Sequence, residues 1–179
     1  RATYEDLLAV PEPLVAEILN GELVTHPRPA APHAAVATHL TGQIDRPFGS
    51  GRGGPGGWVI LFEPELHLQG HVLVPDLAGW RRERLPEVPD AAAIELAPDW
   101  VCEILSPSTA AVDRADKMPI YAELGVSYVW LLDPLACTLE VYQLEAHRYT
   151  VLETWRGAAV VRAAPFDAIE LELGALWEK

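Results

Sequence analysis

Lysine is almost absent from this chain of 179 residues, which contains eleven arginines but only two lysines, Lys117 and the terminal Lys179. Arginine therefore supplies nearly all of the positive charge. A lysine at the interior position 117 indicates a task that the rigid, always charged guanidinium group of arginine cannot perform. Lys117 is for this reason the first candidate functional residue.

Positive charge as a whole is also scarce, with 13 basic against 26 acidic residues and a formal net charge of −13. This balance argues against strong non-specific attraction to nucleic acid. The cluster of Arg81, Arg82 and Arg84 is more typical of a solvated loop than of a phosphate-binding site. Cys102 and Cys137 are the only cysteines and form no Cys-x-x-Cys pair, so neither a disulfide framework nor a thiolate zinc site is indicated.

The sequence has no apolar run long enough to cross a membrane, and no signal peptide opens it. We therefore expect a cytoplasmic protein without a membrane partner. The length is sufficient for one substantial hydrophobic core, and the composition shows no internal boundary. We expect a single domain over residues 1–179.

Apolar periodicity and turn residues predict a chain of mixed α/β type. The spacing of Val36, Leu40 and Ile44 predicts a helix that begins near residue 33, and Asn20-Gly21 predicts a tight hairpin within residues 15–24. Further elements are expected as a loop at 46–57, helices at 3–8 and about 109–124, strands at 58–62, 71–74, 100–105 and 128–133, and antiparallel strands from 139 onward. The predicted fold class is α/β (α+β), a mixed sheet flanked by helices with additional antiparallel C-terminal strands.

The most informative polar residue is Glu103, which lies in the apolar strand 100–105. A carboxylate buried there is costly unless it meets a cation or hydrogen-bond donors. Asp76 ends another apolar run, and if the two strands are neighbours, their carboxylates converge at one end of the sheet. Two hard oxygen ligands suit Mg²⁺, which can ionise a water molecule. Lys117 would then stabilise developing negative charge or position the water.

Each of these residues also has a purely structural interpretation. Asp76 can simply end a strand, and Lys117 can be a helix-surface charge. Glu103 can form a structural ion pair with Lys117 or Arg114. The functional interpretation predicts that the Lys117 ammonium lies within about 3 to 5 Å of the Glu103 carboxylate. Asp99 repeats the Pro-Asp dipeptide of Asp76 but enters its strand at the end opposite Glu103, so we interpret it as a turn residue.

A set of motifs occurs in an order that is typical of one family. They are Glu17-(x3)-Gly21-Glu22, Pro29-(x3)-His33, Pro75-Asp76, Glu103-Ile-Leu-Ser-Pro-Ser108, Asp113-Arg-(x2)-Lys117, Tyr121-(x3)-Gly125-Val126 and Tyr128-Val-Trp-Leu-Leu-Asp-Pro134. With these motifs the sequence resembles, over nearly its whole length, the Uma-two family of putative restriction endonucleases, within the PD-(D/E)XK nuclease superfamily. The resemblance implies a restriction-endonuclease-like core that uses Mg²⁺ or a similar ion such as Mn²⁺.

The resemblance also implies roles for individual residues. Asp76 matches the metal-binding aspartate, and Glu103 matches the acidic residue of the (D/E)XK half-motif. Together with Ile104, they are the residues expected at the metal.

The motif lysine itself is missing, because Leu105 stands where the superfamily usually has it. The resemblance suggests that Lys117, from the following helix, has taken over its role. Glu17 matches a family-typical glutamate and is a further candidate catalytic residue, with a hairpin-surface charge as the alternative. His33 can contact phosphate or transfer protons, although a helix-end histidine bonded to the main chain is the commoner arrangement.

Two functions from different classes follow. The first is a Mg²⁺-dependent DNA endonuclease that cleaves phosphodiesters with metal-activated water. The second is a binding or regulatory protein that keeps the nuclease fold without cleaving, which the acidic balance and the missing in-line lysine favour. The C-terminal antiparallel strands could also pair across a two-fold axis and form a homodimer.

Overall fold

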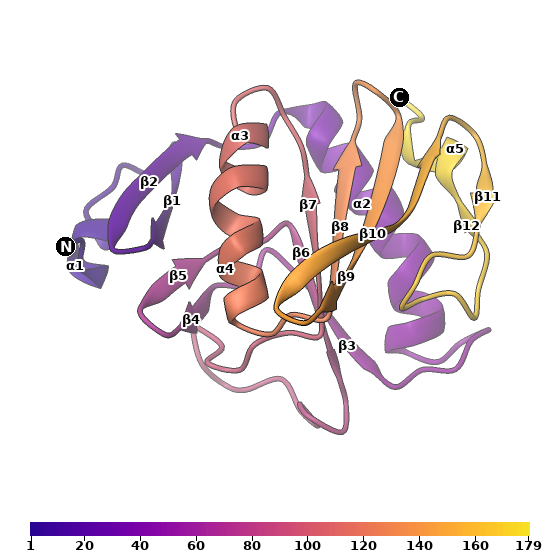
Figure 1. Cartoon of the computed structure of the whole chain (residues 1–179), viewed down its shortest axis with the longest axis horizontal. Helices are drawn as coiled ribbons and strands as arrows, with labels where there is room; N and C mark the ends of the chain where they lie inside the picture. Colours follow the sequence, from indigo (N-terminus) through magenta and orange to yellow (C-terminus); the bar gives the residue numbers. More distant parts are fainter.

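The centre of the protein is a six-stranded mixed sheet, seen in a computed structural model that describes residues 1–179 (Figure 1). Its order is β10-β9-β8-β7-β6-β3, and only the β7–β8 pair is parallel. The strands are β3 (Trp58–Phe62), β6 (Leu77–Arg81), β7 (Trp100–Ile104), β8 (Tyr128–Asp133), β9 (Thr138–Glu145) and β10 (Arg148–Arg156). The predicted mixed sheet with antiparallel strands after residue 139 is confirmed.

A helical crossover joins the two parallel strands, as a parallel pair requires. It consists of α3 (Ala110–Val112), the π-helical turn η2 (Asp113–Lys117) and α4 (Met118–Glu123). The helix ends before Gly125, whose φ of +76° favours glycine. The predicted helix is therefore present, but a wide π turn interrupts it before Pro119.

Helices cover both faces of the sheet (Figure 1). Trp100, Cys102 and Ile104 of β7 pack in the core on the side of α2 (Ala31–Ile44), and Val101 packs on the side of α4. Side chains alternate along a strand, so Glu103 belongs to the α4 side. This alternation directs the one carboxylate of β7 towards the helical crossover.

A smaller antiparallel sheet lies beside the crossover, at the left of Figure 1. Its order is β2-β1-β5-β4, with β1 (Leu14–Leu19), β2 (Glu22–Pro27), β4 (Leu66–Leu68) and β5 (His71–Leu73). Asn20 and Gly21 form the predicted tight turn, with positive φ values of 53° and 82°. The helix expected at residues 3–8 is α1 (Tyr4–Leu8), which begins at a capping box formed by Thr3 and Asp6.

The remaining elements complete the side of the sheet that α2 covers. They are the π-helical turn η1 (Asp45–Gly49), the short strands β11 (Val160–Val161) and β12 (Leu171–Glu172), and the C-terminal helix α5 (Leu173–Leu176). The first part of the expected glycine-rich loop is thus helical. No helix combines the length and the apolar character that crossing a bilayer requires.

The strand expected at residues 71–74 is shorter and belongs to the smaller sheet, where the turn at Gln69-Gly70 joins it to β4. Asp76 does not end this strand but immediately precedes β6. Since β6 runs antiparallel to β7, with Leu77 opposite Cys102, the beginning of β6 lies beside the end of β7. Asp76 and Glu103 therefore lie at the same end of the sheet, as expected. Asp76 reaches this place at the beginning of β6 and not at the end of the strand expected at residues 71–74.

Candidate active site

Glu103 is held by two side chains of the crossover. The Tyr121 hydroxyl donates to its Oε1 atom at 2.5 Å, and the Lys117 Nζ atom lies 2.6 Å from the same oxygen. Glu103 is only 2% exposed and Lys117 is likewise 2% exposed. The predicted proximity of the Lys117 ammonium to Glu103 is confirmed, and the interpretation of Lys117 as a surface charge is wrong.

Lys117 lies at the centre of three carboxylates. Besides Glu103, its Nζ atom contacts Glu17 at 3.0 Å and Asp113 at 3.7 Å. Asp113 and Lys117 are the first and last residues of the π turn η2, so this turn sends both side chains to the same side. Leu105 is buried in the apolar core; the cation of this site therefore comes from the crossover and not from the strand.

Glu17 enters the site from the hairpin and is 1% exposed, so its interpretation as a hairpin-surface charge is wrong. Its Oε1 atom accepts the Val74 N–H at 2.7 Å, and its Oε2 atom lies 3.6 Å from His26 on the paired strand. Burial alone would raise the pKa of Glu17, but the Lys117 charge, the neighbouring His26 ring and the Val74 N–H lower it to about 2. Glu17, which belongs to β1, therefore links the small sheet to the crossover through its ion pair with Lys117.

Replacing this residue by Glu17→Gln should destabilise the protein at neutral pH by about 3 kcal/mol, because its pKa falls from 4.5 to about 2 on folding and each unit is worth about 1.36 kcal/mol. The folded-state pKa is the lower one, so this stabilisation is present above about pH 4.5 and is lost as the pH falls through about 2. Denaturant unfolding at a series of pH values measures the difference from wild type, which should shrink towards pH 2.

Glu22→Gln is the matched control, because Glu22 is exposed on the same hairpin, and its free energy of unfolding should change by less than about 0.5 kcal/mol. A Glu17→Gln effect that is constant between neutral pH and pH 2 would contradict the ionised, charge-paired state of Glu17.

Asp76 bridges the adjacent ends of β6 and β7. Its Oδ2 atom accepts the Ile104 N–H at 2.7 Å, and its Oδ1 atom lies 3.2 Å from His33 Nε2. Burial lowers the pKa of His33, but Asp76 and the main chain of Ile104 outweigh this effect and raise it. The main chain of Ile104 therefore faces the same space as Asp76 and His33, at the N-terminal part of α2.

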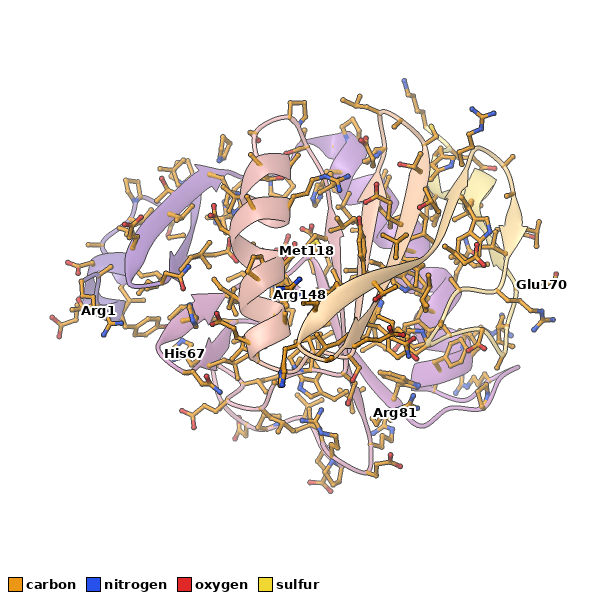
Figure 2. The ribbon with its side chains drawn as sticks, in the orientation of Figure 1. Arg1, His67, Arg81, Met118, Arg148 and Glu170 are labelled. Carbon is orange, nitrogen blue, oxygen red and sulfur yellow. The ribbon has the colours of Figure 1, made fainter.

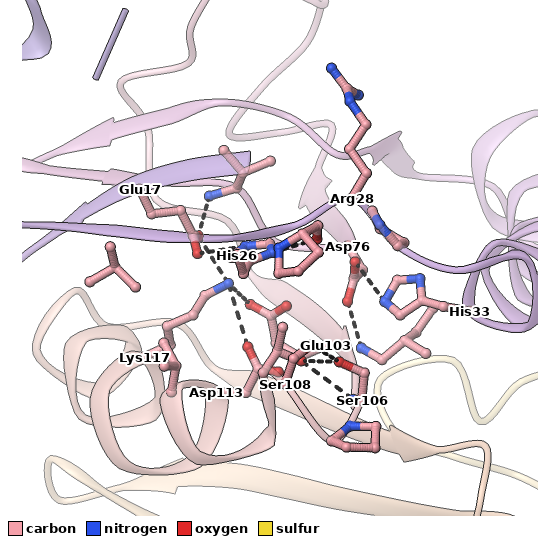
Figure 3. A pocket seen from close by; sticks show the side chains of 18 of the residues that line it. Glu17, His26, Arg28, His33, Asp76, Glu103, Ser106, Ser108, Asp113 and Lys117 are labelled. Atoms are coloured by element: carbon pink, nitrogen blue, oxygen red, sulfur yellow. Dashed lines mark hydrogen bonds and ion pairs between the residues drawn. The ribbon is translucent and has the colours of Figure 1, made fainter. Parts of the chain in front are cut away.

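These residues line one pocket of about 340 Å³, shown in Figure 3. One wall is the extended chain from β2 to α2, and the other is the segment between β7 and α3. The polar and charged residues of the lining are Glu17, Thr25, His26, Arg28, His33, Asp76, Glu103, Ser106, Ser108, Thr109, Asp113 and Lys117. All of the residues expected from the sequence thus lie around a single space.

The pocket concentrates negative charge. Burial, together with neighbouring carboxylates, raises the pKa of Glu103 well above its usual range and also raises that of Asp113. Burial lowers the pKa of Lys117, but the surrounding carboxylates outweigh it and raise this pKa well above the usual value. Lys117 is therefore charged, and a further cation near Glu103 would oppose the burial and repulsion that favour the neutral, protonated form of this residue.

The oxygen atoms available at this site are of the type that Mg²⁺ binds. Asp76 and Glu103 provide carboxylate oxygens, and Ile104 could contribute only its main-chain carbonyl because its side chain is apolar and buried. Mg²⁺ binds through one or two carboxylates and keeps several water molecules. No group of three or more His, Cys, Asp or Glu side chains forms a ready metal cage in this chain, so the residues suit a hydrated ion and not a fully protein-ligated one.

Three residues of this network were not assigned roles from the sequence, namely His26, Asp113 and Tyr121. Asp113 and Tyr121 could have been found from the sequence. Each is four residues from Lys117, and residues four apart share a helix face. His26 could not, because its contact with Glu17 depends on the pairing of β1 with β2.

The second Pro-Asp pair is structural, as expected. Asp99 accepts the Arg81 N–H at 2.8 Å and pairs with Arg84 at 2.9 Å. The Arg81 guanidinium lies 4.6 Å from the centre of the Trp58 ring, at the lower side of the molecule in Figure 2. Two of the three clustered arginines thus stabilise the far end of the sheet, and none of the three lines the pocket.

Comparison with known proteins agrees with this fold. The crystal structure of a putative nuclease belonging to DUF820 from Anabaena variabilis ATCC 29413 is similar with a TM-score of 0.76 and 25% sequence identity, covering 99% of this chain and 98% of that one. No curated protein is significantly similar to the sequence. The model of the Uma2 (Uma-two) family, described as "Putative restriction endonuclease", matches residues 1–174. The chain therefore belongs to the Uma2 family.

Proposed function

We propose that this protein is a Mg²⁺-dependent DNA endonuclease that hydrolyses phosphodiester bonds with a metal-activated water. The observation that carries the proposal is the meeting of Asp76, Glu103 and Lys117 in one pocket, where the adjacent ends of β6 and β7 face the middle of the crossover. Membership of the Uma2 family and similarity to a nuclease fold support the same reaction class.

Neighbouring groups of the chain fix the orientation of Asp76 and Glu103. The Ile104 N–H and His33 fix the orientation of Asp76, and Tyr121 and Lys117 fix that of Glu103. Mg²⁺ bound there would supply a water of lowered pKa and stabilise charge on the phosphate. Lys117 adds a fixed positive charge, which offsets the negative charge that grows during phosphoryl attack. Glu17 and Asp113 hold Lys117 in its charged form and in place.

A second candidate is a binding protein that keeps the fold but does not cleave. Two observations favour it: Lys117 is fully engaged by three carboxylates, and the formal net charge of −13 opposes non-specific DNA binding. This alternative retains the pocket and gives the acidic residues a structural role only.

Cleavage assays separate the two candidates. At least one of two substrates, single-stranded DNA or supercoiled plasmid, should be cut by the purified protein with Mg²⁺ or Mn²⁺, and a chelator should stop the reaction. Glu103→Gln removes one charge but keeps the shape, and it should reduce the rate by at least about 100-fold. Cleavage that persists in a chelator or in Glu103→Gln would exclude the proposed site, and no cleavage under any of these conditions would favour the binding protein.

A further inference from the structure

Three of the acidic residues, Glu17, Glu103 and Asp113, lie buried in the lining of a small pocket. Its volume of about 340 Å³ is near the lower end of the range for small-molecule sites, roughly 300 to 1,000 Å³. Glu17, Glu103, Asp113 and Lys117 are all at most 4% exposed. A substrate must therefore send a narrow part of itself inwards to reach them.

The walls of this pocket are stiff. Pro27 and Pro29 lie in one wall and Pro107 in the other, and proline fixes the backbone angle φ. Between the first two prolines, the Arg28 N–H donates to the Pro13 carbonyl at 3.4 Å and the Arg28 Nε donates to the Glu12 carbonyl at 2.8 Å. The hairpin wall is thus tied to the chain that precedes β1, which opposes widening of the pocket.

Arg28 is the one basic residue of the lining that has no acidic partner. His26 pairs with Glu17, His33 pairs with Asp76, and Lys117 pairs with three carboxylates. The Nε atom of Arg28 is bound to a main-chain carbonyl, which leaves its two terminal nitrogens unpaired. Figure 3 shows Arg28 above Asp76 and His33, pointing away from Glu103. Its exposed guanidinium is therefore available to an anion at the mouth of the pocket.

From this geometry we propose that the pocket accepts one flexible, unpaired strand of DNA, with Arg28 binding a backbone phosphate at the mouth, and not an intact duplex. A duplex, whose major groove alone is about 12 Å wide, is too broad to enter a pocket of about 340 Å³. Pulling a nucleotide out of a duplex disrupts stacking and pairing, and this cost is smallest where the strand is already unpaired. The inference rests on the proposed nuclease function and adds the substrate class.

The test compares three labelled substrates of the same sequence in the presence of Mg²⁺ or Mn²⁺: a single strand, a relaxed and fully paired covalently closed circular duplex, and a nicked form of this duplex that carries an unpaired flap. We expect kcat/KM for the single strand to exceed that for the closed duplex by at least about tenfold. In the flap substrate, cuts should fall in or next to the unpaired segment.

The role of Arg28 is tested with Arg28→Ala. This variant should raise KM for the single strand by about tenfold with kcat nearly unchanged, and it should reduce the slope of log(kcat/KM) against log salt concentration by about 0.7, the value for one phosphate contact on a single strand. Arg52→Ala is the matched control, because Arg52 is exposed outside the pocket, and it should leave KM and the slope unchanged.

The outcomes distinguish failure of the inference about the substrate from failure of the proposed nuclease function. Metal-dependent cutting of the closed duplex at the rate of the single strand, or an unchanged salt slope in Arg28→Ala, would overturn the inference and leave the nuclease intact. Absence of metal-dependent cutting of all three substrates would overturn the nuclease function and the inference with it.

Discussion

Lys117→Met should abolish cleavage and destabilise the protein by about 3–5 kcal/mol, the usual effect of removing one partner of a buried ion pair. The lysine is 2% exposed, and its ammonium lies between Glu17, Glu103 and Asp113. Methionine fills a similar volume but leaves these carboxylates buried without a cation. Denaturant unfolding followed by circular dichroism measures the loss of stability, and DNA cleavage measures the loss of activity.

The chain provides a matched control for this change. Lys179→Met removes the only other lysine, which is exposed at the C-terminus, and should alter neither stability nor cleavage. The double variant Lys117→Met/Glu103→Gln separates the two effects, because removing one buried negative charge should restore part of the stability but none of the activity. If Lys117→Met were as stable as wild type, the assigned charge network would be incorrect.

Features that depend on local chemistry were predictable from the sequence. Asn20-Gly21 specified the turn of the β1–β2 hairpin because both of its residues adopt positive φ. The apolar run around Glu103 specified a strand buried on both faces, and a carboxylate there required a cation. Because Leu105 stands where the resemblance places the motif lysine, Lys117 was the available candidate, and the contact of 2.6 Å between Lys117 Nζ and Glu103 Oε1 agrees.

Features that depend on pairing between distant segments were less accessible. Residues 71–74 have the composition of a core strand, yet β5 pairs with β1 and β4 in the smaller sheet. The sequence did not predict the short strand β4, because three residues are too few to show the apolar alternation of a strand. Glu17 resembled a hairpin-surface charge, and only the packing of that hairpin against the crossover buries it. In each case the sequence pattern involves neighbouring residues, whereas the contact that determines the structure joins segments far apart in the sequence.

The same limit applies to the width of the site. The sequence indicated acidic residues and a metal, but it could not show that the prolines on either side of the pocket form close walls around them. That enclosure arises from two segments about 80 residues apart, near Pro27 and Pro107. We infer from this enclosure which shape of substrate can enter, and only the folded chain allows that inference.

Asp76→Asn should reduce metal-dependent cleavage by at least about 100-fold while leaving the fold intact. The asparagine oxygen can still accept the Ile104 N–H, and its amide can donate to neutral His33, so both contacts of Asp76 have replacements. What is lost is the negative charge that would bind the metal. Thermal unfolding with and without Mg²⁺ gives a second readout, because an ion that binds the folded state alone stabilises it by about 2.7 kcal/mol at a concentration 100 times its Kd.

Asp99→Asn is the control, since Asp99 has the same Pro-Asp context but lies at the other end of β7. Its pair with Arg84 is partly exposed, so this change should cost less than about 1 kcal/mol. It should preserve both cleavage and the stabilisation by Mg²⁺, whereas Asp76→Asn should lose both. Equal cleavage by the two variants, or Mg²⁺ stabilisation that survives in Asp76→Asn, would remove Asp76 from the metal site and leave the convergence of β6 and β7 as a structural feature only.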